Sequence, residues 1–69
     1  MLVNVDKKTL YRLRKEKGYS MHRLSLAAGL GKNAVEKMEK DNGKSSYVRV
    51  QAIAHVLNVE PSVLISKEA

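Results

Sequence analysis

The chain has 69 residues, of which 43% are hydrophobic, carries a formal net charge of +6 and contains no cysteine. A chain of this length supports one small core, which neither disulfides nor a cysteine-based metal site can hold together here. It has no apolar stretch of about 18 residues that would predict a membrane span, and its first residues are too short for a signal peptide. We therefore expect residues 1–69 to form a single intracellular domain built from packed helices.

The positive charge is concentrated in the first part of the chain. Residues 1–49 hold 12 Lys or Arg and 5 Asp or Glu, a net charge of +7, whereas residues 50–69 hold one Lys and two Glu, a net charge of −1. This asymmetry favours a polyanion bound on one side. A basic helix lying on a membrane is the alternative, but it needs a bare apolar face, and the apolar residues of the basic segments are needed for the core.

The chain begins with apolar and β-branched residues (1–5) that predict a short extended arm. Asp6 can cap a first helix, Lys7 to Lys17, which Gly18 closes. The inner stripe of this helix combines apolar and basic residues at helical spacing: Leu10, Leu13, Arg14 and Lys17.

Arg14 thus lies at the border of an apolar stripe, and Glu39 has the same placement in the third predicted helix, beside Val35. Two opposite charges at core margins predict a partly buried ion pair between Arg14 and Glu39. The alternative is that both side chains extend to water.

Residues 20–40 predict two short helices joined by a tight turn, with Ser20 as the first N-cap and Gly29 at the end of the first helix. The second helix, expected from Lys32, has a packing side formed by Ala34, Val35 and Met38. Its polar side consists of Lys32, Asn33, Glu36, Lys37 and Lys40. This arrangement is typical of a DNA-reading helix-turn-helix, and the alternative is an amphipathic hairpin whose outer face is merely solvated.

After a polar loop over residues 41–46, Ser46 can cap a fourth helix, Tyr47 to Leu57. This helix has two apolar stripes, which predicts a second packing partner for one of them. The core stripe consists of Val50, Ile53, Ala54 and Leu57, and the outer stripe of Val48, Ala52 and Val56. Asn58 ends the helix, Pro61 opens a short last one, and residues 66–69 are expected to be a frayed end.

The sequence lacks the patterns of an enzyme: it has no nucleophile–base spacing, no phosphate-binding Gly-rich loop and no paired metal ligands. His22 and His55 stand far apart and are expected to be surface residues. With three Tyr and no Phe or Trp, a stacking platform for single strands is not expected, which favours duplex DNA. We therefore expect no catalytic residue, metal, cofactor or small-molecule substrate.

From Leu10 to Ile65 the chain resembles the Cro/phage-repressor (Xre-like) helix-turn-helix family. The resemblance is carried by LRKEKGYS at 13–20, Leu24, AAGL at 27–30, AVEKMEK at 34–40 and AIAHVLNV at 52–59. It implies an all-α, five-helix repressor-like DNA-binding domain. In this family an Arg and a Glu also pair at the positions of Arg14 and Glu39.

The resemblance further implies how DNA is held. Base edges in the major groove would be contacted by Lys32, Asn33, Glu36 and Lys37, whose donors, amide and carboxylate suit guanine, adenine and cytosine. The DNA backbone would be held by Ser20, Met21, Lys40, Asn42, Gly43, Lys44 and Ser46.

The chain departs from the family pattern in three respects. Met21 stands where Gln is usual, Gly31 replaces the Ser or Thr that caps the recognition helix, and Val48 and Ala52 occupy sites that are commonly polar. The first two departures argue against strong DNA binding. The third indicates an additional protein interface.

The sequence thus predicts a cytoplasmic, bacterial or phage-encoded transcriptional regulator that binds double-stranded DNA sequence-specifically, as a homodimeric repressor. The alternative is a protein-interaction module of the same fold, such as an antitoxin or anti-repressor component.

Overall fold

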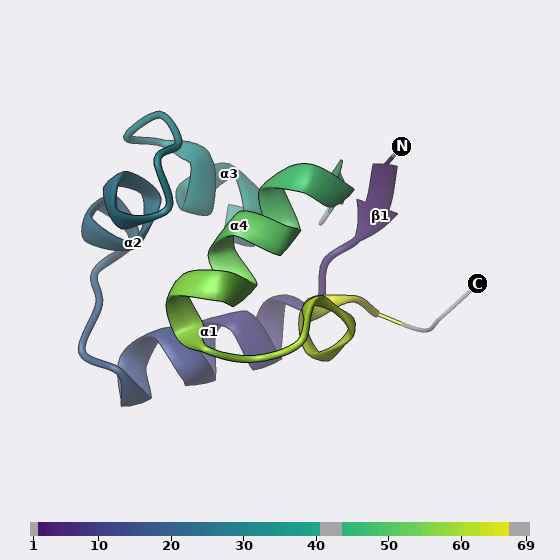
Figure 1. Cartoon of the computed structure of the whole chain (residues 1–69), viewed down its shortest axis with the longest axis horizontal. Coiled ribbons are helices and arrows are strands. Elements are labelled where there is room, and N and C mark those ends of the chain that lie inside the picture. The colour runs from purple at the N-terminus through teal and green to yellow at the C-terminus, as the bar shows by residue number, and fades with distance from the viewer. Residues whose placement is uncertain (1, 41–43, 67–69) are drawn as a thin grey trace.

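The computed structural model describes residues 2–40 and 44–66. Helices dominate it, with a small two-stranded sheet at one side (Figure 1). In chain order the elements are β1 (Leu2–Asn4), α1 (Lys7–Glu16), α2 (Met21–Ala27), α3 (Ala34–Lys40), β2 (Lys44–Ser46), α4 (Tyr47–Leu57) and the 3₁₀ helix η1 (Pro61–Leu64). Within the described residues, no helix is long and apolar enough to cross a bilayer.

The expectation of five α-helices was wrong. The described residues contain four, and the last element is the 3₁₀ helix η1 instead of a fifth α-helix. The third helix, α3, also begins later than expected, at Ala34 instead of Lys32. The Ala34 amide donates to the Gly31 carbonyl at 3.0 Å, which closes a turn, and the Lys37 amide donates to the Asn33 carbonyl at 3.0 Å. Lys32 and Asn33 therefore lie in the turn that leads into α3.

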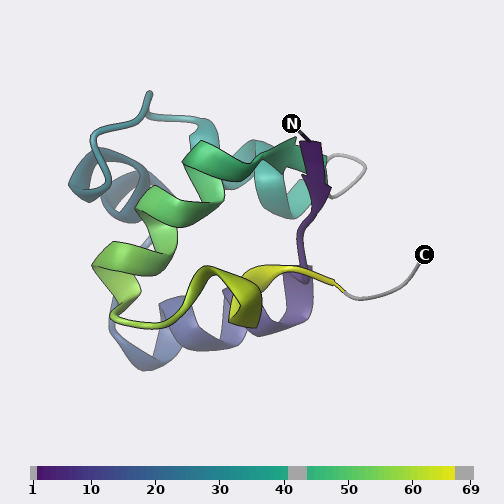
Figure 2. The same ribbon diagram turned by 45° about the vertical axis from the view of Figure 1, so that its right-hand side comes forward.

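The strand β2 was not predicted, since residues 41–46 were expected to be a loop. It pairs antiparallel with β1, with Val3 opposite Ser45, so the predicted N-terminal arm is extended and is held in a sheet (Figure 2). Beyond β1 the chain pairs with the C-terminal segment: Val5 bridges Ile65, and the Ser66 amide donates to the Asn4 carbonyl at 2.7 Å. Ser66 is thus attached to the arm, and residues 67–69 of the expected frayed end lie outside the described residues.

Three α-helices begin and end in the same way. The predicted N-caps are confirmed: Asp6, Ser20 and Ser46 each accept a hydrogen bond from the backbone N–H three residues later. At the C-termini, Gly18, Gly29 and Asn58 take left-handed conformations, with φ of 78°, 76° and 61°. The following amides bond back into the last turn, as from Leu30 N to Ser25 O at 3.0 Å. These local signals fix the helix ends before any packing.

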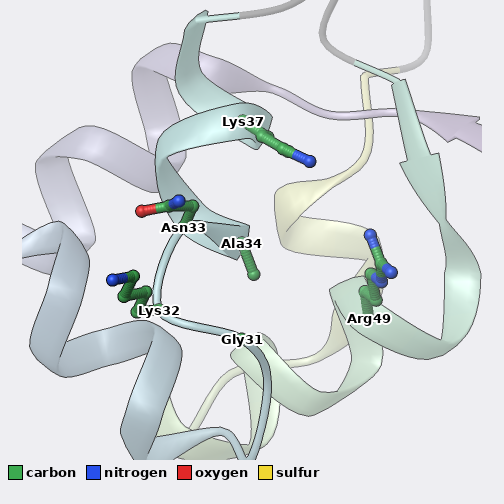
Figure 3. A pocket seen from close by; sticks show the side chains of 6 residues that line it. All are labelled: Gly31, Lys32, Asn33, Ala34, Lys37 and Arg49. Carbon is green, nitrogen blue, oxygen red and sulfur yellow. The ribbon is translucent and has the colours of Figure 1, made fainter.

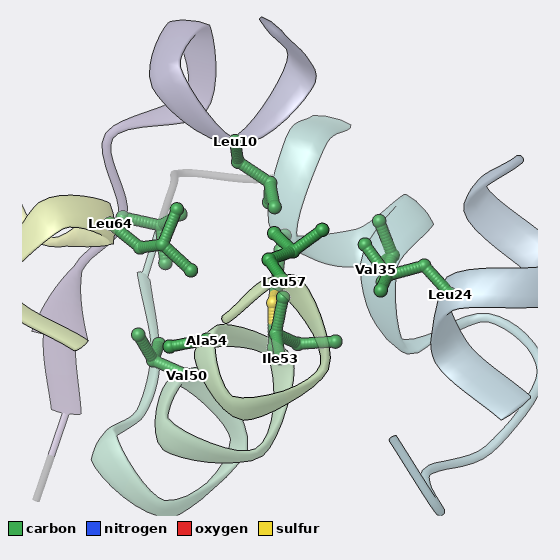
Figure 4. Packing of buried hydrophobic residues seen from close by; sticks show 10 residues of the cluster. Leu10, Leu24, Val35, Val50, Ile53, Ala54, Leu57 and Leu64 are labelled. Carbon is green, nitrogen blue, oxygen red and sulfur yellow. The ribbon is translucent and has the colours of Figure 1, made fainter. Parts of the chain in front are cut away.

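The helix α4 lies at the centre of the core, and its bounds are those predicted from the sequence. Its predicted core stripe is confirmed as buried (Figure 4). It packs against apolar side chains from all the other helices: Leu10, Leu24, Val35, Met38 and Leu64. A single apolar helix surrounded by amphipathic ones is how so short a chain encloses a core.

Candidate nucleic-acid interface

The side chain of Ser25 joins the two helices of the helix-turn-helix. Its hydroxyl Oγ donates to the Met21 carbonyl at 2.8 Å within α2 and accepts from the Val35 amide at 2.9 Å, at the start of α3. Ser25 is fully buried. Gly31 has no side-chain oxygen that could cap the start of α3. The Ser25 hydroxyl, from the preceding helix, accepts instead from one of the backbone N–H groups that the first turn of α3 leaves without a partner in that helix. This contact fixes where α3 begins relative to α2.

The ion pair between Arg14 and Glu39 fixes the other end of α3. Arg14 Nε and Nη2 donate to the two carboxylate oxygens of Glu39 at 2.8 and 3.2 Å, and Nη1 donates to the Tyr19 carbonyl at 3.0 Å. The Arg14 guanidinium carbon also lies 5.1 Å from the centre of the Tyr11 ring. The two charged side chains are only 8% and 10% exposed. A two-bond contact of this kind ties α3 to α1 in a defined orientation.

A hollow of about 310 Å³ opens on the outer side of α3 and reaches the first turn of α4 (Figure 3). Three of the predicted base-reading residues lie around it with three neighbours: Gly31, Lys32, Asn33, Ala34, Lys37 and Arg49. Lys37 and Arg49 extend toward each other across Ala34, whereas Lys32 and Asn33 point away from Arg49. The surface around the start of α3 therefore offers two cations, Lys37 and Arg49, on one side and a cation with an amide, Lys32 and Asn33, on the other.

Glu36 does not join this set. Its carboxylate oxygen Oε2 lies 3.3 Å from Lys40 Nζ, one helical turn along α3, in an exposed pair. Lys40 partly neutralises the one acidic side chain that the described part of this surface presents, which lowers the cost of placing Glu36 near phosphates. The same pair engages Lys40, which was expected to contact the DNA backbone.

The other expected backbone contacts that fall in the described residues do not line the hollow. The hydroxyls of Ser20 and Ser46 accept from the amides of Arg23 and Arg49 as helix caps. Met21 is half-buried against the core, and Lys44 is exposed on β2. Asn42 and Gly43 lie outside the described residues.

Arg49 was missed by the sequence analysis, which weighed α4 only by its apolar stripes. The signal was present, because Arg49 is the only Lys, Arg, Asp or Glu in α4. A single cation on an otherwise neutral helix, next to its N-terminus, is a candidate for binding an anion outside the fold. Among the described residues, no group of three His, Asp or Glu side chains could hold a metal ion.

Comparison with known proteins places the chain among helix-turn-helix proteins. A family model described as helix-turn-helix matches residues 10–64. The restriction-modification controller protein C.AhdI from Aeromonas hydrophila is 30% identical, over 83% of this chain and 86% of that one, with a TM-score of 0.74. SinR of Bacillus subtilis, a master regulator for biofilm formation solved in complex with DNA, is 28% identical over 81% of this chain and 90% of that one, with a TM-score of 0.73.

An enzyme also contains this fold. A mutant of hydroxyethylphosphonate dioxygenase matches 96% of this chain with 21% identity and a TM-score of 0.79, but the match covers only 14% of the dioxygenase. At that identity the likeness concerns the fold alone. A search of curated proteins found no match to this chain.

Proposed function

Because the chain belongs to the helix-turn-helix family of the Cro and phage-repressor type, we propose that it is a sequence-specific regulator that binds double-stranded DNA with α3 in the major groove. The observation that carries this proposal is the hollow beside α3, around which Lys32, Asn33 and Lys37 stand exposed. The relation to C.AhdI and to SinR supports it at the level of the protein class.

Each of these exposed side chains can form hydrogen bonds with the edge of a base. Asn33 can pair with an adenine in two hydrogen bonds, and Lys32 and Lys37 can donate to the N7 and O6 atoms of guanine. Glu36, paired with Lys40, can accept from a cytosine amine. Because Lys32 and Asn33 lie in the turn before α3, they would enter the groove at the N-terminal end of that helix. That end is the one a recognition helix usually presents to the bases.

Backbone phosphates would be held around this reading surface. Lys44 offers a charged donor from β2, and the start of α2 offers Ser20 and Met21. We propose the same role, contact with backbone phosphates, for Lys40, Asn42, Gly43 and Ser46. Such contacts fix the register of the protein on the duplex without selecting its sequence.

We further propose that two copies bind a two-fold symmetric site through the outer face of α4. Beside the end of α2 this face forms a groove of about 460 Å³, lined by Ala27, Ala28, Val48, Gln51, Ala52, His55 and Val56. None of these carries a permanent charge, in a chain of net charge +6. An uncharged, self-complementary patch lets two copies meet without placing like charges directly against each other at the contact. In the cytoplasm, such a dimer would act as a repressor by occupying its operator.

Selection of bound duplexes from a random pool, at two salt concentrations, tests the proposal. A sequence-specific regulator is expected to enrich one motif at both concentrations, with half-sites about one helical turn apart. Binding that falls with salt and enriches no motif would reject sequence reading.

The apolar groove on α4 also supports a second candidate, a protein-interaction module of the same fold. Val48 is 71% exposed on this face, and an exposed apolar patch commonly marks a protein contact. The same selection separates the candidates, because an interaction module would enrich no motif whether or not it forms dimers.

A further inference from the structure

We propose that Arg49 binds a phosphodiester of the DNA strand that borders the groove occupied by α3. The inference rests on the proposed function of α3 and adds to it a backbone contact from a different helix. It assigns a role to the exposed arginine that the sequence analysis passed over.

The backbone of Arg49 is firmly positioned. Its amide donates to the Ser46 hydroxyl at 3.3 Å in the capped first turn of α4, and the next residue, Val50, is 1% exposed in the core. The side chain leaves this fixed point on the side of the hollow opposite Lys37, and the small residues Gly31 and Ala34 line the hollow between them (Figure 3). Because Gly31 and Ala34 are small, the hollow leaves room for a group from outside to approach the guanidinium.

The guanidinium of Arg49 has no acidic partner within residues 2–40 and 44–66. Arg14 is bonded to Glu39, and Arg12 lies 4.0 Å from Glu16, but no ion pair of the described residues includes Arg49. An exposed guanidinium with no carboxylate partner keeps all five donors for a ligand. Its planar fork matches the geometry of phosphate oxygens.

The position of Arg49 on α4 decides between a base and a phosphate. The major groove is about 12 Å wide and admits one α-helix, whose own diameter with side chains is about 10–12 Å. With α3 in the groove, a side chain from the neighbouring helix meets the groove wall, which is the sugar–phosphate backbone. Lys37, on α3 itself, stays within reach of the base edges.

The test compares Arg49→Gln with Arg12→Gln, a matched variant that removes the same charge from the exposed side of α1. Affinity for the selected duplex is measured across a salt series. For Arg49→Gln we expect the slope of log K against log salt to shrink by about 0.9, as for one lost phosphate contact, with the selected motif unchanged. For Arg12→Gln we expect the wild-type slope. Thermal unfolding checks that both variants are folded, and Arg49→Lys should restore the slope.

Duplexes with a single uncharged methylphosphonate locate the contact. One substituted position should weaken binding of the wild type and of Arg12→Gln but leave Arg49→Gln unaffected. A changed motif in Arg49→Gln would show base reading, and an unchanged slope would show no contact; either result overturns the inference and leaves the role of α3 intact. A wild type that prefers no duplex would instead remove the proposed function itself.

Discussion

At the scale of single residues, the buried ion pair between Arg14 and Glu39 connects α3 to α1. Replacing Arg14 with Met leaves the Glu39 carboxylate buried without a partner, and we expect a loss of about 3–5 kcal/mol in the free energy of unfolding. With Glu39→Gln added, the total loss should fall short of the sum of the two single losses by about 0.5–3 kcal/mol. Urea unfolding of the single and double variants measures this coupling.

The pair Arg12 and Glu16 is a natural control for that cycle. It joins the same residue types at 4.0 Å, with side chains 66% and 61% exposed. The same substitutions at these positions should show a coupling of about 0–1 kcal/mol, because solvent screens the charges. Equal coupling in the two cycles would mean that burial of Arg14 and Glu39 does not increase their coupling free energy.

The hydroxyl of Ser25 is the second residue-scale feature with a measurable consequence. Ser25→Ala leaves the buried Val35 amide without its acceptor, and we expect a cost of about 1–3 kcal/mol in the free energy of unfolding. Ser62→Ala, on the exposed side of η1, should change stability by less than about 0.5 kcal/mol. Hydrogen exchange at the Val35 amide should also become faster in Ser25→Ala; wild-type protection there would contradict the proposed cap.

At the scale of elements, local chemistry predicted most of the architecture. The caps Asp6, Ser20 and Ser46 and the terminators Gly18, Gly29 and Asn58 act within a few residues, so they can be found in a single sequence. The strand β2 could not be found this way, because its partner β1 lies some 40 positions away. The start of α3 was placed too early because the cap comes from Ser25 on another helix.

The outer face of α4 is the element on which self-association is predicted to depend. Val48 is 71% exposed, and Val48→Lys places a charge in the proposed two-fold contact. We expect this variant to be shifted from the proposed dimer toward monomer in sedimentation equilibrium, since each copy would bring an added like charge to the contact. Val63→Lys, at a 42% exposed position on η1, should leave the dimer intact. A wild type that is monomeric at high concentration would refute this interface.

At the scale of the whole molecule, the charge asymmetry of the sequence indicates the proposed binding surface only in outline. It indicated a basic first part of the chain, and Lys32, Asn33 and Lys37 do come together around one hollow. The lone cation of α4 could be noticed in the sequence, but that Arg49 shares a hollow with the turn before α3 depends on the tertiary arrangement of the helices. The pairing of Glu36 with Lys40, by contrast, follows from their spacing of four residues on one helix.

The most direct test of the account compares binding-site selections on Asn33→Ala and Lys44→Ala with the wild type. Asn33→Ala removes the proposed two-bond base contact, so it should lose about 1–3 kcal/mol of discrimination at one position per half-site. Lys44→Ala removes the proposed phosphate contact, so it should weaken binding to all sequences and keep the wild-type motif. If Asn33→Ala selects the wild-type motif unchanged, then α3 does not read DNA in the proposed register.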